Sequence, residues 1–437
     1  MASTDERVIR RFPEGIVWPP ASKSLLHRAV ICAALAEGRS LIHNVTISED
    51  IEATLGGVRA LGANWRLDGR TLCIDGGGER RSGAIDCKES GSTLRFLIPV
   101  AAMSGQGAIF EGKGRLLERP MGAYASAFRR AGVAFQHSPD GIKVGGPLRG
   151  GIYTLPGDVS SQFVSGLLLA LPLAAEDSEI RLESPLESRQ YAEMTMDVMA
   201  AFGVSCEAAG ATSGVGREAA GDVSGVSREA AGDSFRVRGG QRYTPSEYTV
   251  EADFSQAAYF LAAAALGRDV ACAGLSAGSR QGDIAILRIL EGMGAEIRWG
   301  GGQVSARADR LKGASFDARE NPDLVPPVAA LCCFCEGESR IVNAGRLRLK
   351  ESDRLSALAQ GLSRLGADIS EAADSLTIRG APELKGGATV DAHNDHRIAM
   401  AMALAAIRCK NPVRLTGWRS VQKSYPDFWR DFEKTPQ

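Results

Sequence analysis

The sequence predicts an α/β protein with mixed sheets, built from six copies of one structural unit. An apolar helix pattern runs into a glycine and directly on into a strand pattern at five places, Gly62, Gly132, Gly203, Gly294 and Gly366. These glycines recur at intervals of roughly 71 residues, apart from one longer gap, and a further interval accounts for the rest of the chain. Such a period indicates supersecondary units that stack on their neighbours to bury their apolar faces.

Each unit shows the same order of elements. The first unit predicts two helices, at 23–36 and 48–61, and three strands, at 40–45, 63–67 and 71–74. The fifth unit repeats this order, with helices at 325–335 and 351–365 and strands at 338–343, 367–371 and 375–378. Alternating helices and strands that close with a hairpin favour mixed sheets. Because helix segments such as 29–35 and 260–266 are apolar on every side, we expect helices inside and sheets outside.

The six units predict two domains of three units each. We expect the first domain at 21–246 and the second from 1–20 together with 247–437, with an opening strand at about 7–17 that completes the second. The stretch 241–247 is polar and contains a proline, as interdomain linkers do. The longer gap has a visible cause, because residues 213–222 recur almost unchanged at 224–233. This Gly-rich repeat has little to bury and predicts a flexible insertion at about 207–234.

Composition and charge exclude several classes of protein. The net charge of the 437 residues is −1 and no long basic run occurs, so a nucleic-acid-binding surface is not expected. The apolar runs are too short to span a bilayer and residues 1–14 lack a signal-peptide core, which predicts a soluble, cytoplasmic protein. The nine cysteines show no metal-ligand spacing. Around Cys332, Cys333 and Cys335 a buried helix is favoured over a Cys-rich metal site.

The first helix of every unit begins in a short polar segment. The six segments are 21–24, 89–93, 158–162, 253–256, 321–323 and 394–397. Ser, Thr, Asp and Asn are ordinary N-cap residues, so each segment by itself indicates a helix cap. Helix N-termini also present free N–H groups and a partial positive charge, which suit anions. If pseudosymmetry directs all six toward one cleft, that cleft is suited to polyanionic small molecules.

Basic residues cluster near the same helix starts and support an anion site. They are Lys23, Arg28, Arg95, Arg119, Arg346, Arg348, Lys350, Arg354, Arg397 and Lys423. Arginine is suited to bidentate contacts with carboxylate and phosphate, although the same residues could form salt bridges between the domains. Asp323 and Glu351 are the candidate acid–base pair, and helix-start roles are the alternative for both. His396 is a candidate proton carrier, with a cap or core histidine as the alternative.

Several of these motifs occur together in a fixed order. They are Ser22-Lys-Ser24 with Arg28, Ser92-Thr-Leu-Arg95, Glu118-Arg-Pro120, Ser160-Ser-Gln162, Gln281-Gly-Asp283, Pro322-Asp323, Lys350-Glu-Ser-Asp-Arg354, Asn394-Asp-His-Arg397 and Lys423-Ser-Tyr-Pro426. Over about residues 15–430 this set resembles the 5-enolpyruvylshikimate-3-phosphate synthase family. The resemblance implies an enolpyruvyl transferase-like, inside-out α/β barrel fold, with two domains of three βαβαββ units and an active site between them.

The resemblance also implies an activity. The enolpyruvyl group of phosphoenolpyruvate would pass to the 5-hydroxyl of shikimate-3-phosphate through a tetrahedral intermediate, with release of phosphate, in the shikimate pathway to chorismate and aromatic amino acids. Acid–base catalysis and fixed cations suffice, so no metal or cofactor is expected. The expected partners are these two small molecules, without nucleic acid or membrane, and we expect a monomer.

The matching motifs assign residues to each substrate. Those implied for shikimate-3-phosphate are Lys23, Ser24, Arg28, Ser160, Ser161, Gln162, Ser188, Tyr191, Asp323, Arg346 and Lys350. Those implied for phosphoenolpyruvate are Lys23, Gly91, Arg119, Gln162, Arg354, Arg397 and Lys423. Proton transfer is implied for Lys23, Asp323 and Glu351.

The chain departs from the family pattern at two single positions and in one short segment. Ala21 stands where the family usually has glycine, and Arg346 replaces an asparagine of some members. Glu89 opens a segment in which the family has Asn-Ala-Gly-Thr, so a carboxylate lies near the expected phosphoenolpyruvate pocket and bears on affinity for that substrate and for glyphosate. Two alternatives stay open: a UDP-N-acetylglucosamine enolpyruvyl transferase, which typically carries a cysteine in the region matching 111–118, and a non-catalytic anion-binding protein.

Overall fold

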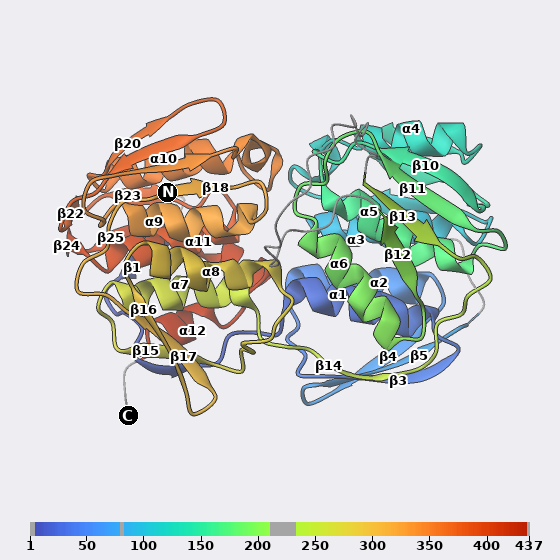
Figure 1. The fold of residues 1–437 in the computed structure, drawn as a ribbon, viewed down its shortest axis with the longest axis horizontal. Coiled ribbons are helices and arrows are strands. Elements are labelled where there is room, and N and C mark those ends of the chain that lie inside the picture. Colours follow the sequence, from blue (N-terminus) through green and yellow to red (C-terminus); the bar gives the residue numbers. More distant parts are fainter. Residues whose placement is uncertain (1–4, 79–82, 210–232, 435–437) are drawn as a thin grey trace, which may run out of the picture.

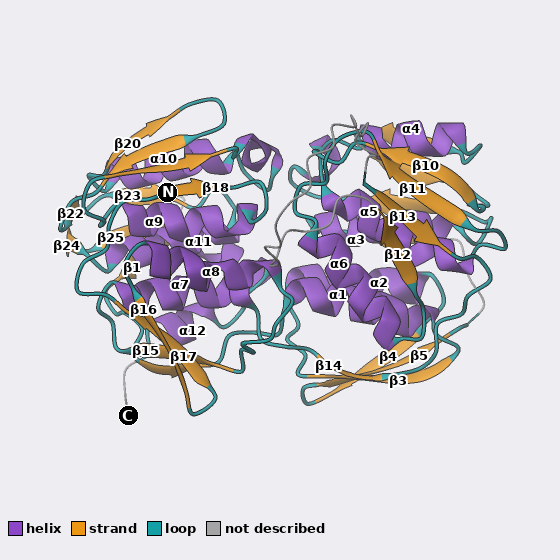
Figure 2. Cartoon of the chain, in the orientation of Figure 1, coloured by secondary structure: helices purple, strands orange, loops and turns teal. Residues whose placement is uncertain are grey.

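The chain forms two α/β halves of similar build, each with helices inside and sheets outside (Figures 1 and 2). The computed structural model describes residues 5–78, 83–209 and 233–434. No helix in these ranges is both long and apolar enough to cross a membrane. The tandem repeat expected at 213–233 lies almost wholly outside the described residues.

Three four-stranded sheets surround the first half. Their strand orders are β14 (Glu247–Thr249), β3 (Gly38–His43), β5 (Thr71–Gly76), β4 (Asn64–Asp68); β6 (Ala84–Asp86), β7 (Ala108–Glu111), β9 (Gly141–Val144), β8 (Phe135–Ser138); and β10 (Gly151–Leu155), β11 (Ser178–Leu182), β13 (Ser234–Val237), β12 (Cys206–Ala209). In each sheet the first pair is parallel and the others are antiparallel. The repeated unit of the sequence is therefore visible as a repeated sheet.

The second half repeats this arrangement with one change. Two sheets match those above, in the orders β2 (Gly15–Val17), β15 (Val270–Ala273), β17 (Gln303–Arg307), β16 (Glu296–Gly300) and β18 (Ser315–Asp317), β19 (Glu338–Val342), β21 (Leu376–Arg379), β20 (Asp368–Glu371). The last sheet contains β23 (Thr389–Asp391), β25 (Val413–Thr416) and β1 (Glu6–Ile9), beside the short pair β22 (Leu384–Gly386) and β24 (Cys409–Asn411). Here β1 pairs antiparallel with β25 and replaces the closing hairpin of the sixth unit.

The helices fill the space between the sheets. The first helices of the six units are α1 (Lys23–Leu35), α3 (Gly91–Ala102), α5 (Ser161–Ala170), α7 (Phe254–Ala265), α9 (Val325–Cys332) and α11 (His396–Ala406). Nearly every residue of α3, α5, α7, α9 and α11 is buried, as their all-round apolar sequences predict. The second helices are α2 (Glu49–Ala60), α4 (Gly122–Arg130), α6 (Gln190–Ala201), α8 (Ala285–Gly292) and α10 (Arg354–Arg364), and α12 (Phe428–Phe432) follows the sixth unit.

Two separate apolar cores divide the chain, and we propose that they are its two domains. The first core gathers buried residues from Ala21 to Val250. The second gathers Ile9, Val17 and buried residues from Ala252 onward. Because β14 pairs with β3, the proposed boundary lies near Val250 rather than at residue 246. The chain then crosses between the proposed domains twice, near Ala21 and near Ala252. An isolated β-bridge joins these two residues.

Three expected elements differ from the structure. The opening strand at 7–17 is two short strands, because β1 and β2 join two different sheets of the second half. The expected helix at 351–365 begins at Arg354, where the Asp353 side chain accepts a hydrogen bond from the Ser356 N–H and caps the helix. The ends of the expected 207–234 insertion are strands rather than loop, since β12 pairs with β13.

Candidate active site

The first turns of five helices, and the 3₁₀ turn before a sixth, line one pocket between the two halves. Residues at the starts of α1, α3, α5, α7 and α11 line it, as does the 3₁₀ turn Pro322–Leu324 that precedes α9. Their pocket-lining residues are Lys23, Ser24, Gly91, Ser92, Ser161, Gln162, Ser255, Gln256, Pro322, Asp323, His396 and Arg397. All six polar segments contribute residues to this pocket, as the condition of a common cleft requires. The partial positive charges of the helix N-termini favour negative charge there.

Helix capping coexists with this convergence. The side chains of Ser90, Ser160, Asp253 and Asp395 accept hydrogen bonds from backbone N–H groups of α3, α5, α7 and α11 at 3.1, 3.3, 3.2 and 2.9 Å. Ser22 and Asn321 make no such cap. The interpretation of the polar segments as helix caps therefore holds at four of the six helix starts.

Buried arginines supply the positive charge of the pocket in the first half. Arg28 donates from Nε to the Thr195 hydroxyl at 2.7 Å and from Nη1 to the Ser24 carbonyl at 2.7 Å. Arg95 donates to Gln162 Oε1 at 2.7 Å. The Nε atoms of Arg95 and Arg119 are buried without a hydrogen-bond partner in the part of the chain that the structure describes. Buried guanidinium groups with unused donors are suited to an anionic ligand.

Asp323 lies between two arginines of the second half. Its carboxylate oxygens accept hydrogen bonds from Arg354 at 3.1 Å and from Arg397 at 2.8 Å. Burial raises the pKa of Asp323, but the charges of Arg397, Lys350 and Arg354 outweigh it and hold the pKa below its ordinary value. Asp323 is therefore ionised at neutral pH. It belongs to the 3₁₀ turn before α9 and is not the N-cap residue, which is Asn321.

Glu351 and Lys350 lie in the segment before α10. Glu351 accepts a hydrogen bond from Arg354 at 2.7 Å and lies 3.5 Å from Arg119 of the other half. Burial raises the pKa of Glu351, yet the charges of Arg354 and Arg119 hold it well below its ordinary value. Burial lowers the pKa of Lys350 to about 8, although Asp323 opposes this shift. The first-turn helix role considered for Glu351 is wrong, because α10 begins three residues later.

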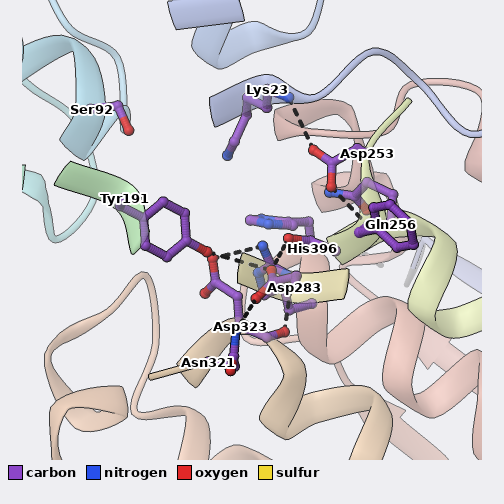
Figure 3. A network of polar contacts seen from close by, with 12 residues as sticks. Lys23, Ser92, Tyr191, Asp253, Gln256, Asp283, Asn321, Asp323 and His396 are labelled. Carbon is purple, nitrogen blue, oxygen red and sulfur yellow. Dashed lines mark hydrogen bonds and ion pairs between the residues drawn. The ribbon is translucent and has the colours of Figure 1, made fainter. Parts of the chain in front are cut away.

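A second carboxylate network, missed in the sequence, supports this site (Figure 3). Asp283 accepts hydrogen bonds from Asn321 at 3.1 Å and from the Tyr191 hydroxyl at 3.4 Å, and it also bonds Ser255. Burial, and next the charge of Asp323, raise the pKa of Asp283 to about 6. The motif Gln281-Gly-Asp283 included Asp283 among the resembling residues, but it did not predict that Asp283 forms this buried network.

Lys23 also has an acidic partner that sequence reasoning missed. Its ammonium group lies 2.6 Å from Asp50 of α2, and its backbone N–H donates to Asp253 at 3.0 Å. His396 is buried, and neither ring nitrogen has a hydrogen-bond partner among the described residues. Burial and the nearby charge of Lys23 hold the pKa of His396 well below its ordinary value, so the imidazole is neutral.

The structure brings together all but one of the predicted site residues. Ser160, Ser161, Ser188, Tyr191, Arg346, Lys350, Arg119 and Arg354 line the same pocket as the helix starts. The exception is Lys423, whose ammonium group pairs with Glu89 and donates to the Asn394 carbonyl at 2.5 Å. Arg346 pairs with Glu187 at 2.6 Å across the halves. Salt bridges between the halves, the alternative for these cations, therefore do occur at Lys423, Arg346 and Arg119.

The cysteine cluster lies apart from the pocket. Cys332, Cys333 and Cys335 are buried at the end of α9, where the thiols of Cys333 and Cys335 donate to carbonyls one turn earlier. Within the described ranges, no group of three or more His, Cys, Asp or Glu side chains is arranged to hold a metal ion.

The fold and the cation-lined pocket define an enolpyruvyl transferase-like protein. The family model of EPSP synthase (3-phosphoshikimate 1-carboxyvinyltransferase) matches residues 13–432. The chain belongs to this family. It is 41% identical over 426 residues to a 3-phosphoshikimate 1-carboxyvinyltransferase of Clostridium perfringens, covering 96% of this chain and 95% of the relative. A protein of the same description from Clostridium acetobutylicum is also 41% identical, over 96% of this chain and 95% of its own.

Solved structures share the architecture. An EPSP synthase from Acinetobacter baumannii superimposes with a TM-score of 0.74 at 26% identity, covering 97% of this chain and 96% of that one. The enolpyruvyl transferase NikO from Streptomyces tendae has the same TM-score at 17% identity, over 98% of this chain and 96% of its own, and shows the fold alone.

Proposed function

We propose that this protein transfers the enolpyruvyl group of phosphoenolpyruvate to the 5-hydroxyl of shikimate-3-phosphate and releases phosphate. The observation that carries this proposal is the pocket in which five helix N-termini and the 3₁₀ turn before α9 meet buried cations from both halves. Two substrates that each bear a phosphate and a carboxylate suit such a pocket. Membership of the EPSP synthase family supports the same assignment.

The two substrates would occupy different parts of the pocket. Shikimate-3-phosphate would contact the serines at the start of α5, together with Ser188, Tyr191, Arg346 and Lys350. Phosphoenolpyruvate would lie nearer the starts of α3 and α11. Its proposed ligands are Lys23, Gly91, Arg119, Arg354, Arg397 and Lys423, with Gln162 between the two substrates. Glycine at position 91 suits this contact, because an added Cβ would lie 2.8 Å from an Arg119 nitrogen.

The chemistry needs proton transfers and no redox step. An acid protonates the methylene of phosphoenolpyruvate, which makes its central carbon electrophilic. The 5-hydroxyl oxygen attacks that carbon and loses its proton to a base, giving a tetrahedral adduct. A methyl proton then leaves with the phosphate, which restores the double bond. Lys23, whose ammonium group lies 2.6 Å from Asp50, suits the acid, whereas ionised Asp323 and Glu351 suit the two proton-accepting steps.

Phosphate release in the presence and absence of shikimate-3-phosphate tests this function. We expect release from phosphoenolpyruvate only when shikimate-3-phosphate is present. Release with UDP-N-acetylglucosamine instead would support the related transferase, although residues 111–118 contain no cysteine. Tight binding of both substrates without release of phosphate would indicate a non-catalytic anion-binding protein.

The ionisation of Lys350 predicts how shikimate-3-phosphate binding depends on pH. Because the pKa of Lys350 is about 8, the side chain loses its positive charge as the pH rises through that value. We therefore expect the KM for shikimate-3-phosphate to rise above about pH 8. Steady-state kinetics from pH 6.5 to 9.5 measure this. Lys350→Arg, which stays charged, should remove the break, and an unchanged break in that variant would contradict the assignment.

The ion pair between Glu89 and Lys423 predicts a gain of affinity. Glu89 neutralises a cation proposed to bind phosphoenolpyruvate, and it also accepts a hydrogen bond from Asn394 at 3.0 Å. Glu89→Gln keeps the size of the side chain and frees the ammonium group. We expect the KM for phosphoenolpyruvate to fall by about tenfold, the scale of one charge-assisted hydrogen bond.

A nearby surface pair provides the control for the Glu89 variant. Glu52 lies 2.5 Å from Lys88 and is outside the pocket lining, so Glu52→Gln should leave both KM values unchanged. A higher KM for phosphoenolpyruvate in Glu89→Gln would show that Glu89 positions Lys423 and does not compete with the substrate.

A further inference from the structure

Gln256 presents an unused amide to the pocket. It is the third residue of α7, is 1% exposed and lines the pocket. Neither its Oε1 nor its Nε2 atom has a hydrogen-bond partner among the described residues. A buried amide that lacks partners destabilises the free protein, so such groups are rare in native proteins. A bound ligand can supply the missing partner.

The surroundings of Gln256 indicate which substrate it faces. Its backbone N–H donates to Asp253 at 3.2 Å, and the same carboxylate accepts from the Lys23 N–H at 3.0 Å. Figure 3 shows Gln256 beside Asp253, on the Lys23 side of the network. Tyr259 lies three residues further along α7, hence on the same helix face, and its hydroxyl donates to the Arg397 carbonyl at 3.3 Å. Gln256 therefore lies between the starts of α1 and α11.

Both helix starts carry cations assigned above to phosphoenolpyruvate, namely Lys23 and Arg397. The start of α1 is shared, because Lys23, Ser24 and Arg28 are also assigned to shikimate-3-phosphate. Arg397 is assigned to phosphoenolpyruvate alone, and the shikimate-3-phosphate residues Ser160, Ser188 and Arg346 belong to other elements. His396, at the start of α11, likewise has two buried ring nitrogens without a hydrogen-bond partner among the described residues. This side of the pocket thus combines positive charge with neutral polar groups that form no hydrogen bond within the described part of the chain.

We propose that Gln256 is a specificity residue for phosphoenolpyruvate, whose side-chain NH₂ group donates a hydrogen bond to an oxygen of that substrate. This inference rests on the proposed function. A neutral donor fixes the orientation of an anion that the surrounding cations attract from several directions, because a hydrogen bond is directional and a point charge is not. The amide that lacks hydrogen-bond partners destabilises the free protein, and the hydrogen bond to phosphoenolpyruvate would offset this cost in the complex.

Gln256→Met tests the proposal, because it keeps the length of the side chain and removes both polar groups. We expect the KM for phosphoenolpyruvate to rise at least tenfold while the KM for shikimate-3-phosphate changes less than twofold. The melting temperature should stay the same or rise, since a buried unpaired amide is lost. A wild-type KM for phosphoenolpyruvate in folded Gln256→Met would overturn the proposal, and so would an equal rise in both KM values.

Two further variants complete the experiment. Ser178→Ala is the control, because the buried Ser178 hydroxyl also has no hydrogen-bond partner among the described residues. Ser178 lies on β11, outside the pocket lining, so the variant should leave both KM values unchanged. Gln256→Glu keeps the shape of the side chain and adds a negative charge, so it should weaken phosphoenolpyruvate binding more than Gln256→Met. If Gln256→Met does not fold, a wild-type KM in Gln256→Glu overturns the proposal. Phosphate release by the wild-type protein is measured first, and its absence refutes the proposed function independently of Gln256.

Discussion

Asp323→Asn should lower kcat by roughly 10²–10⁴-fold, the usual contribution of a positioned general base. The substitution keeps the size of the side chain and its contacts with Arg354 and Arg397, but an amide cannot take the proton of the attacking hydroxyl. In the free protein these arginines hold the pKa of Asp323 low. Bound substrate anions would share the two guanidinium groups and so make the carboxylate a better proton acceptor. The KM for shikimate-3-phosphate should rise as well, because Asp323 is also proposed to contact that ligand.

Asp353→Asn is the matched control for this variant. Asp353 is also a carboxylate at a helix start, where it caps α10 and lies 2.8 Å from Arg348, but it is outside the pocket lining. If Asp323 serves only the helix start, the two variants should behave alike, with altered melting temperatures and normal turnover. A wild-type kcat in folded Asp323→Asn protein would refute the catalytic role.

Residue patterns predict most of the architecture, because each unit repeats local signals. The helix at 23–36 and the hairpin at 63–74 are observed within about two residues, since apolar patterning defines each face and Gly62 separates α2 from the hairpin. The sixth sheet could not be predicted in this way. Its third strand is β1, from the opposite end of the chain, and no local pattern records that pairing.

The site was predicted less completely, for a physical reason. Serines, arginines and carboxylates at helix starts are visible in the sequence, since capping and anion binding use the same residue types. The ion pair of Glu89 with Lys423 depends on how the two halves meet. Gln256 differs again, because an amide indicates a ligand only when it is buried without a hydrogen-bond partner, and burial is a tertiary property.

Glu351→Gln should also lower kcat by roughly 10²–10⁴-fold, with little change in shikimate-3-phosphate affinity. The charges of Arg354 and Arg119 keep Glu351 ionised, so it is suited to accept the methyl proton as the phosphate leaves. Glutamine retains the size of the side chain and can still bond an arginine through its oxygen, but it cannot take a proton. Since addition of the hydroxyl does not need this group, the tetrahedral adduct should accumulate in a single turnover.

Rapid-quench analysis with enzyme in excess distinguishes this role from a structural one. Loss of a buried ion-pair partner alone would change the melting temperature and the substrate affinities without accumulation of an intermediate. Glu371→Gln is the control. Glu371 belongs to β20, forms an ion pair with Arg348 at 2.6 Å and is outside the pocket lining, so we expect this variant to have normal turnover. Accumulation of the adduct in Glu351→Gln, with kcat reduced and Glu371→Gln unaffected, would assign proton removal to Glu351. A normal kcat in Glu351→Gln would leave that step to another group, and of the neighbouring side chains Lys350, with its pKa of about 8, would then be the one to test.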